Sequence, residues 1–168
     1  MASPSEWYKD NFLISTAPAL LQPDAINEAF DSDFIYWAKK TPVDQLKKLL
    51  ANSLCFGLYE LPTSSADIAG RAAGPKQIGL ARLITDRVSF AYMTDVYVLP
   101  EYQGTGLGVW LLSKVSDELD SWPDLRRSML ITSGHGSFYE KKMGFKVFEQ
   151  GENDLQVLMK RGRGSVLS

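Results

Sequence analysis

The chain has 168 residues and a formal net charge of −2, with the apolar and charged fractions of an ordinary folded protein. This length favours one domain, which we place at residues 1–160, with a disordered tail at 161–168. The charge argues against nucleic acid as a partner, and no apolar run is long enough to span a membrane. Because the N-terminus also lacks the pattern of a signal peptide, we expect a cytoplasmic protein.

A single cysteine, Cys55, and a single histidine, His135, limit the chemistry of the chain. They exclude an internal disulfide and a His/Cys zinc site, so we expect chemistry without a metal. Cys55 lies in the apolar run SLCFGLYEL, which favours a buried side chain over a reactive thiol.

The first half of the chain predicts strands separated by two helices. One helix opens at Pro23, and the next begins with Thr41 as its N-cap and Pro42 at its first position. Residues 62–75, PTSSADIAGRAAGP, are small and turn-forming, which predicts a mobile hairpin loop. In the strand after that loop, Gly79 indicates a bend or the close approach of another backbone. The strands are expected at 12–16, 54–61 and 77–85.

The second half alternates strands with helices. Apolar residues recur at helical spacing from Gly108 to Leu119, and Pro123 ends this helix. A shorter helix is expected at 136–143, with Gly144 as its left-handed cap. Strands are expected at 88–99 and 129–132, and a final hairpin at 145–148 and 155–159. This order predicts a mixed sheet with helices on its faces, in the α/β or α+β class.

The central strand runs into the sequence VYVLPEYQGTGLG, so a strand, a glycine loop and a helix follow one another. Such a module can hold a phosphate, because glycines let the backbone approach closely and a helix N-terminus attracts anions. A P-loop is excluded, since no lysine follows these glycines at the required spacing. A dinucleotide fingerprint is disfavoured because Val109 stands where the third glycine belongs. A nicotinamide oxidoreductase is therefore the weaker interpretation.

The loop does satisfy the pattern QxxGxG, through Gln103, Gly106 and Gly108. Together with the VxVxPEY segment before it and the block GSFYEKKMGF at 136–145, it resembles the GNAT superfamily of N-acetyltransferases over residues 80–148. The resemblance implies a compact, stand-alone GNAT domain that uses acetyl-CoA as its cosubstrate. It also implies a mostly antiparallel sheet whose fourth and fifth strands splay apart to admit the pantetheine arm.

The resemblance assigns coenzyme binding to the end of the central strand, the glycine loop and the last helix. In the last helix, Ser137 is a better candidate than His135 for a contact with the coenzyme. For Lys142, as for Lys141, the alternative to coenzyme binding is a solvated position on an exposed helix face. His135 in the same turn is expected to be a solvated loop histidine. The coenzyme-binding residues so assigned are Val96, Tyr97, Val98, Gln103, Gly104, Thr105, Gly106, Leu107, Gly108, Ser137 and Lys142.

For catalysis the resemblance implies direct attack by the amine in a ternary complex. Tyr139 matches the family's general acid, and backbone N–H groups near Val98 match the usual oxyanion donors. The general base stays open, because Tyr92 occupies the position where a carboxylate often falls. Asp95 is the nearest acidic residue, and a bulge in its strand decides where it points. Water or an amine already deprotonated would serve instead.

The acceptor is expected to be a small-molecule primary amine. Four aromatic residues, Phe34, Tyr36, Trp37 and Tyr92, are candidates for the wall of its pocket, with core packing as the alternative. The competing functions are a non-catalytic acetyl-CoA-binding module and a protein lysine or N-terminal acetyltransferase. Membrane partners are not expected, and the chain is predicted to be a monomer or a homodimer.

Overall fold

The computed structural model describes residues 3–63, 74–149, 157–158 and 160. Its strands are β1 (Glu6–Lys9), β2 (Phe12–Ser15), β3 (Leu54–Glu60), β4 (Lys76–Thr85), β5 (Phe90–Val98) and β6 (Arg127–Leu130). Its helices are α1 (Pro23–Phe30), α2 (Val43–Ala51), α4 (Leu107–Asp120) and α5 (Gly136–Met143), with short 3-10 turns η1 (Pro18–Leu20) and η2 (Pro100–Tyr102). None of the helices in these ranges has the length and apolar character needed to cross a membrane.

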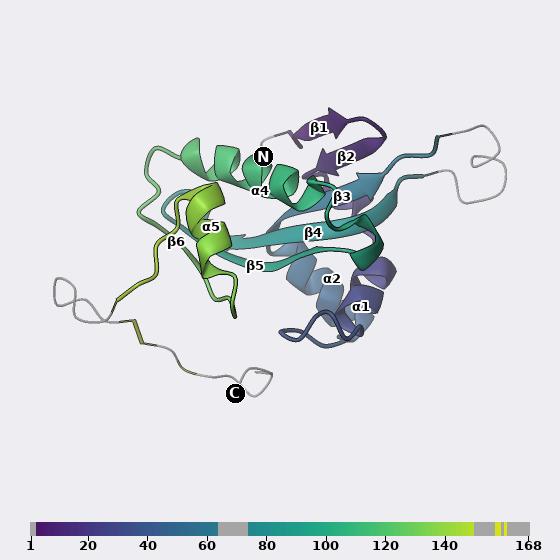
Figure 1. Ribbon diagram of the computed structural model, residues 1–168. Coiled ribbons are helices and arrows are strands. Elements are labelled where there is room, and N and C mark those ends of the chain that lie inside the picture. The colour runs from purple at the N-terminus through teal and green to yellow at the C-terminus, as the bar shows by residue number, and fades with distance from the viewer. Residues whose placement is uncertain (1–2, 64–73, 150–156, 159, 161–168) are drawn as a thin grey trace.

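The strands form one six-stranded sheet in the order β1-β2-β3-β4-β5-β6. Neighbouring strands are antiparallel except β5 and β6, which are parallel. Figure 1 shows α4 on one face of this sheet, α1 and α2 on the other, and α5 beside β6. The predicted mixed sheet with helices on its faces is therefore confirmed.

An apolar core lies on each face of the sheet. The larger core packs the buried side of α4 on the sheet and includes Phe56 and Met93. The second core packs α1 and α2 on the opposite face and includes Phe30, Leu46 and Tyr97. The buried face of α4 follows the predicted 3.6-residue spacing, through Leu107, Leu111, Leu112, Val115 and Leu119.

The parallel pair β5 and β6 separates before β5 ends. Residues are paired from Phe90 with Arg127 to Met93 with Leu130, whereas β5 continues to Val98. The half of β5 that does not pair with β6 contains a bulge, because its register with β4 shifts between Leu80 and Arg82. The expected splay between these two strands is thus present on the side from which the glycine loop leaves.

Gly79 brings β4 and β5 close together at this end of the sheet. It pairs with Val98, and a Cβ atom on Gly79 would lie 2.8 Å from the carbonyl oxygen of Tyr97. Real Cβ atoms do not approach backbone oxygens so closely, so a larger residue here would push β5 away. The predicted close approach of another backbone is confirmed.

Three local predictions differ from the structure. The edge strand β1 was not predicted, since its four residues are mostly exposed and show no alternation, although Trp7 stacks on Phe56. Thr41 does not cap α2, because the Asn27 side chain binds its backbone and the N-cap is Pro42. Residues 145–148 form no strand, since no described strand pairs with them.

Two further predictions concern segments that are only partly described. In the loop predicted at 62–75, residues 64–73 lie outside the part of the chain that the structure describes. The second arm of the final hairpin, 155–159, and the tail at 161–168 lie largely or wholly outside them. The helix at 136–143 is formed with its predicted bounds, and Gly144 caps it with a φ of 71°.

Candidate active site

The glycine loop between β5 and α4 has the backbone conformation that its glycines permit. Gly104 and Gly106 have φ angles of 77° and 84°, in the left-handed region that other residues rarely adopt. Gly106 is the N-cap of α4, and space around both glycines is open. The first amide groups of an α-helix have no acceptor within the helix, so those that follow Gly106 are suited to an anion.

Side-chain contacts tie this loop to the sheet. The Gln103 amide nitrogen donates to the carbonyl oxygen of Val98 at 2.8 Å, which closes the loop onto the strand it leaves. In the η2 turn, the Tyr102 hydroxyl donates to Glu60 at 2.6 Å and accepts from Lys76 at 3.3 Å. The N-terminal end of α4, which is the candidate anion site, is therefore held in place by β3 and β4 as well as by β5.

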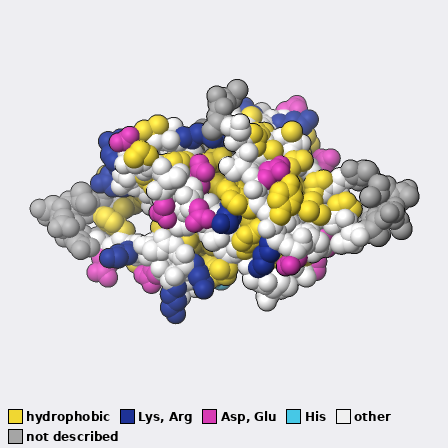
Figure 2. Space-filling view, turned by 90° about the horizontal axis from the view of Figure 1, so that it is seen from above, with side chains coloured by type: hydrophobic (Ala, Val, Ile, Leu, Met, Phe, Trp, Pro, Cys, Tyr) yellow, Lys and Arg dark blue, Asp and Glu magenta, His cyan; other side chains and the backbone are white. Residues whose placement is uncertain are grey.

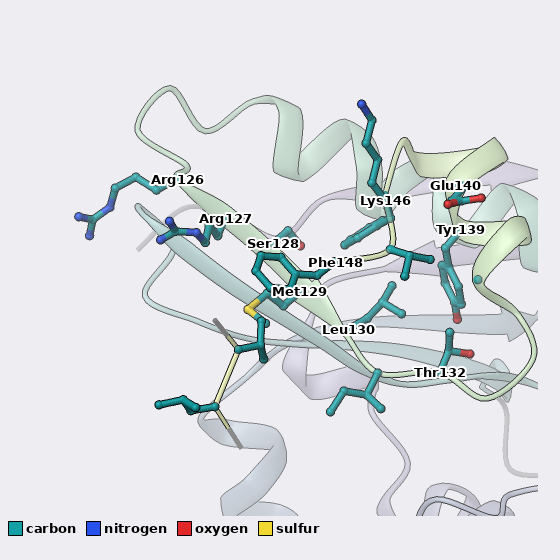
Figure 3. Close-up of a pocket in the computed structure, with 16 residues that line it drawn as sticks. Arg126, Arg127, Ser128, Met129, Leu130, Thr132, Tyr139, Glu140, Lys146 and Phe148 are labelled. Carbon is teal, nitrogen blue, oxygen red and sulfur yellow. The ribbon is translucent and has the colours of Figure 1, made fainter. Parts of the chain in front are cut away.

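Tyr139 lies on α5, half-buried between two aromatic neighbours. Its ring makes edge contacts with Phe138 and Phe145, at centroid distances of 5.5 and 6.4 Å, and it packs against the core beneath α4. Burial, and then the neighbouring Tyr36, raise the pKa of the Tyr139 phenol above its usual value. The phenol is therefore neutral and carries its proton at physiological pH. Figure 3 shows the Tyr139 hydroxyl directed toward Thr132.

A second segment, between α1 and α2, reaches toward α5. The Tyr36 hydroxyl accepts a hydrogen bond from the backbone N–H of Ser133 at 3.3 Å, across 97 residues of sequence. The Tyr36 side chain is 47% exposed, and its ring lies edge-on to Trp37 with centroids 5.0 Å apart. The structure thus places Tyr36, a candidate for the acceptor wall, near Tyr139, the candidate acid, whereas Trp37 also packs against the second core.

The other two aromatic candidates differ in their surroundings. Phe34 packs into the second core against Tyr97, with ring centroids 6.2 Å apart, so its contacts are those of a packing residue. Tyr92 is half-exposed on β5, and its cross-strand neighbours are Ile84 on β4 and Met129 on β6. Burial and the charge of Asp95 raise the pKa of Tyr92, so its hydroxyl is neutral.

Asp95, the acidic residue nearest to the expected base position, is buried and paired. Its carboxylate accepts from the Nε of Arg82 at 2.7 Å, and the two side chains are 8% and 9% exposed. Asp95 is also the bulged residue of β5, with a φ of 50°. Arg82 was missed by the sequence reasoning, although a lone cation inside the apolar strand QIGLARLIT is a signal that could have found it.

Of the other predicted residues, those in or next to α5 lie at the surface, and Cys55 lies in the core. His135, Ser137 and Lys142 are exposed, and Lys142 lies in the last turn, where its charge also complements the helix dipole. Cys55 is buried, which raises the pKa of its thiol to about 12 and keeps it protonated. Among the described residues, no group of three or more histidine, cysteine or acidic side chains could hold a metal ion.

An open pocket of about 1010 Å³ runs along β6 and α5. Its wall includes Arg127, Met129, Tyr139 and Phe148, as Figure 3 shows. Among the predicted site residues only Tyr139 lines it, and the glycine loop does not. The pocket therefore borders the candidate site at Tyr139 and does not contain the predicted anion-binding end of α4.

Charges of both signs are interspersed on the face seen from above in Figure 2. That face shows no gathering of lysine and arginine.

The splayed β5 and β6 strands and the glycine loop at a helix N-terminus define an acetyltransferase fold. The model of the acetyltransferase (GNAT) family matches residues 24–145, and the chain belongs to this family of acyltransferases. Members of the family use acetyl-CoA as their cosubstrate.

Individual relatives agree with this assignment. A Gibberella zeae protein named as an acetyltransferase is 41% identical over 172 residues, which cover 98% of this chain and 97% of that protein. GCN5-related N-acetyltransferase 2 of Arabidopsis thaliana is 32% identical over 71% of this chain and 48% of its own length. A crystal structure of a GNAT-family protein from Xanthomonas campestris is 29% identical, with a TM-score of 0.67, covering 92% of this chain and 95% of that one.

Proposed function

We propose that the chain transfers the acetyl group of acetyl-CoA to a small primary amine by direct attack in a ternary complex. The observation that carries this proposal is the position of Tyr139. This side chain packs against the α4 core, which supports the anion-binding loop, and it also neighbours Tyr36 of the candidate acceptor segment. A neutral phenol between these two regions is placed to give a proton to a departing thiolate.

The cosubstrate would be held mainly by backbone groups. The amides that follow Gly106, together with the dipole of α4, suit the pyrophosphate, and the open space at Gly104 and Gly106 allows its approach. Ser137 and Lys142 would contact the coenzyme from α5. The end of β5 that does not pair with β6, near Val96 and Val98, would lie along the pantetheine arm.

In the proposed reaction the amine nitrogen forms a bond to the thioester carbonyl carbon, and the bond from that carbon to sulfur breaks. A backbone N–H near Val98 would donate to the carbonyl oxygen as negative charge develops on it. Tyr139 would protonate the thiolate. The proton lost from the amine would pass to water or to the Tyr92 hydroxyl on its way to solvent. Holding both substrates in one cleft supplies further rate enhancement.

The surroundings of the acceptor segment favour an amine with an apolar or aromatic body. The exposed Tyr36 ring offers a surface to such an amine, and on the sheet the candidate Tyr92 has the apolar neighbours Ile84 and Met129. A protonated amine that approaches such rings gains about 0.5–2 kcal/mol per good cation–π contact. Deprotonation at the reacting centre then gives the nucleophile.

The test is an acetylation screen that detects the free coenzyme A thiol. Arylalkylamines, polyamines, amino acids, aminoglycosides and lysine-containing peptides are each mixed with acetyl-CoA and the wild-type chain. We expect turnover of at least one small amine, with reactions lacking amine as the background control. Strong turnover of lysine peptides, together with indifference to every small amine, would assign the chain to protein acetylation instead. Thiol release from none of them would support a non-catalytic binding module.

A further inference from the structure

Arg82 and Asp95 are the only buried charged residues among those the structure describes. The Arg82 Nε donates to the Asp95 carboxylate at 2.7 Å, and the Thr94 hydroxyl approaches the other carboxylate oxygen at 3.4 Å. A buried ion pair contributes little to stability, because the loss of hydration offsets the attraction between the charges. The presence of this pair inside the sheet therefore calls for another explanation.

The backbone at Asp95 supplies that explanation. Asp95 has a φ of 50°, a conformation that non-glycine residues rarely adopt. The other described non-glycine residues with positive φ, Asp10 and Arg87, lie in exposed turns. Asp95 instead forms the bulge of the central strand, where the surrounding contacts must hold it in place.

Arg82 connects this bulge to the helix layer. Its Nη1 donates to the Ser53 hydroxyl at 2.9 Å, and that hydroxyl donates to the carbonyl oxygen of Leu49 at 2.8 Å. The planar guanidinium thus binds two partners at fixed angles, which a lysine cannot do. The network runs from β5 through β4 to the C-terminal end of α2.

The bulge determines where the end of β5 directs its backbone. Before the bulge, Arg82 pairs with Thr94, and after it Leu80 pairs with Tyr97. The extra residue turns the following segment, so that Tyr97 faces the second core and Val98 faces the core beneath α4. The N–H groups of this segment are those assigned above to the oxyanion.

We propose that Arg82 is a positioning residue for acetyl transfer: it holds Asp95 in the left-handed bulge, and the bulge aims the backbone N–H groups near Val98 at the developing oxyanion. This inference rests on the proposed function. It assigns Asp95 a structural task within the site in place of proton abstraction, since the carboxylate is enclosed and already engaged by the guanidinium.

The test compares Arg82→Met, Asp95→Asn and the double variant Arg82→Met/Asp95→Gly with the wild-type chain. Arg82→Met keeps an unbranched side chain and removes the guanidinium. We expect kcat to fall about 10²-fold, the loss that follows removal of one oxyanion donor. The Kd for acetyl-CoA, measured by calorimetry, should stay within about threefold of the wild-type value, because the glycine loop is not altered.

The other two variants separate positioning from general base catalysis. Asn also tolerates positive φ and can still accept from Arg82. Asp95→Asn should therefore keep kcat within about tenfold of wild type, with the same pH profile, whereas loss of a general base costs about 10²–10⁴-fold. In the double variant glycine adopts the bulge freely and no unpaired charge remains. The kcat of the double variant should therefore be at least about tenfold higher than that of Arg82→Met.

Specific results would overturn the inference. One is a loss of about 10²-fold or more in Asp95→Asn together with disappearance of the acidic limb of its pH profile, which would make Asp95 the base. Unchanged kcat in Arg82→Met would show that the ion pair does not affect the site. If Arg82→Met does not fold, the double variant decides: a folded protein with wild-type circular dichroism and no more than about 1% of wild-type kcat would show that a freely formed bulge does not restore turnover, and this would also overturn the inference. Failure of the wild-type chain to release thiol with any amine would instead refute the proposed function, and this inference with it.

Discussion

The two sides of the candidate site are built in different ways. On the proposed coenzyme side, the end of β5, the η2 turn and the start of α4 are consecutive in sequence, and Gln103 and Tyr102 tie them to the sheet with hydrogen bonds of 2.8 and 2.6 Å. On the acceptor side, Tyr36 and Ser133 come from segments 97 residues apart and share one hydrogen bond of 3.3 Å. The coenzyme side is anchored, whereas the acceptor side is half-exposed.

This difference has a consequence for binding. An anchored loop loses little freedom when its ligand arrives, so its backbone groups can bind a constant feature such as a pyrophosphate. A surface with few contacts rearranges at low cost and suits a variable substrate. Changes on one side should therefore affect one ligand and leave the other nearly untouched. Tyr139, which packs against the core beneath α4 and lies near Tyr36, should instead affect the chemical step.

The largest effect is expected from Tyr139→Phe. Removing the hydroxyl deletes the proposed acid and keeps the aromatic packing against Phe138 and Phe145, so kcat should fall by about 10²–10⁴-fold. The Kd for acetyl-CoA should not change. The matched control is Tyr8→Phe, the same substitution at a side chain that is 63% exposed on β1. A Tyr139→Phe variant with the parental kcat would make Tyr139 a packing residue only.

A smaller effect is expected from Tyr36→Ala. Loss of the ring should raise the acceptor KM by about tenfold, in line with a contact worth about 1–2 kcal/mol, with no change in acetyl-CoA affinity. Tyr36→Phe should raise the acceptor KM less, because the ring remains and only the hydrogen bond to Ser133 is lost. Steady-state kinetics with a saturating cosubstrate measures both. A Tyr36→Ala variant that binds acetyl-CoA worse and leaves the acceptor KM unchanged would contradict the division between the two sides.

The smallest effect concerns pH. The Tyr139 pKa is raised above 10.0, first by burial and then by Tyr36, so the phenol keeps its proton as pH rises to that value. The turnover number should therefore not decline between about pH 7 and pH 10 on account of the acid. It should increase where the acceptor amine loses its proton. A basic limb with a midpoint near pH 8 that disappears in Tyr139→Phe would show that the pKa is lowered instead.

The coenzyme side could be predicted from the sequence because its determinants are local. The glycines at 104 and 106, the helix after them and the cap at Gly144 each depend on residues within a few positions, and the structure has them as expected. The splay of β5 and β6 followed from the family resemblance, and the register of the two strands agrees with it.

The acceptor side could not be predicted in the same way. The contact between Tyr36 and Ser133 depends on how two distant loops approach each other, and no local pattern encodes it. The same holds for the pairing of Arg82 with Asp95, which follows from the register of β4 and β5 and from the bulge. Phe34 and Trp37 have similar sequence surroundings to Tyr36, yet they pack against the second core and Tyr36 does not.

The most direct test of the account is the affinity of Gly106→Glu for acetyl-CoA, measured by titration calorimetry. The substitution puts a carboxylate and a Cβ atom on the left-handed N-cap of α4, where the pyrophosphate is expected. Gly144→Glu is the matched control, since Gly144 also has positive φ and open space but lies at the C-terminal end of α5. We predict at least about a tenfold loss of affinity in Gly106→Glu and little change in the control. Equal affinity in Gly106→Glu and the wild-type chain would contradict the assignment of this loop to the coenzyme.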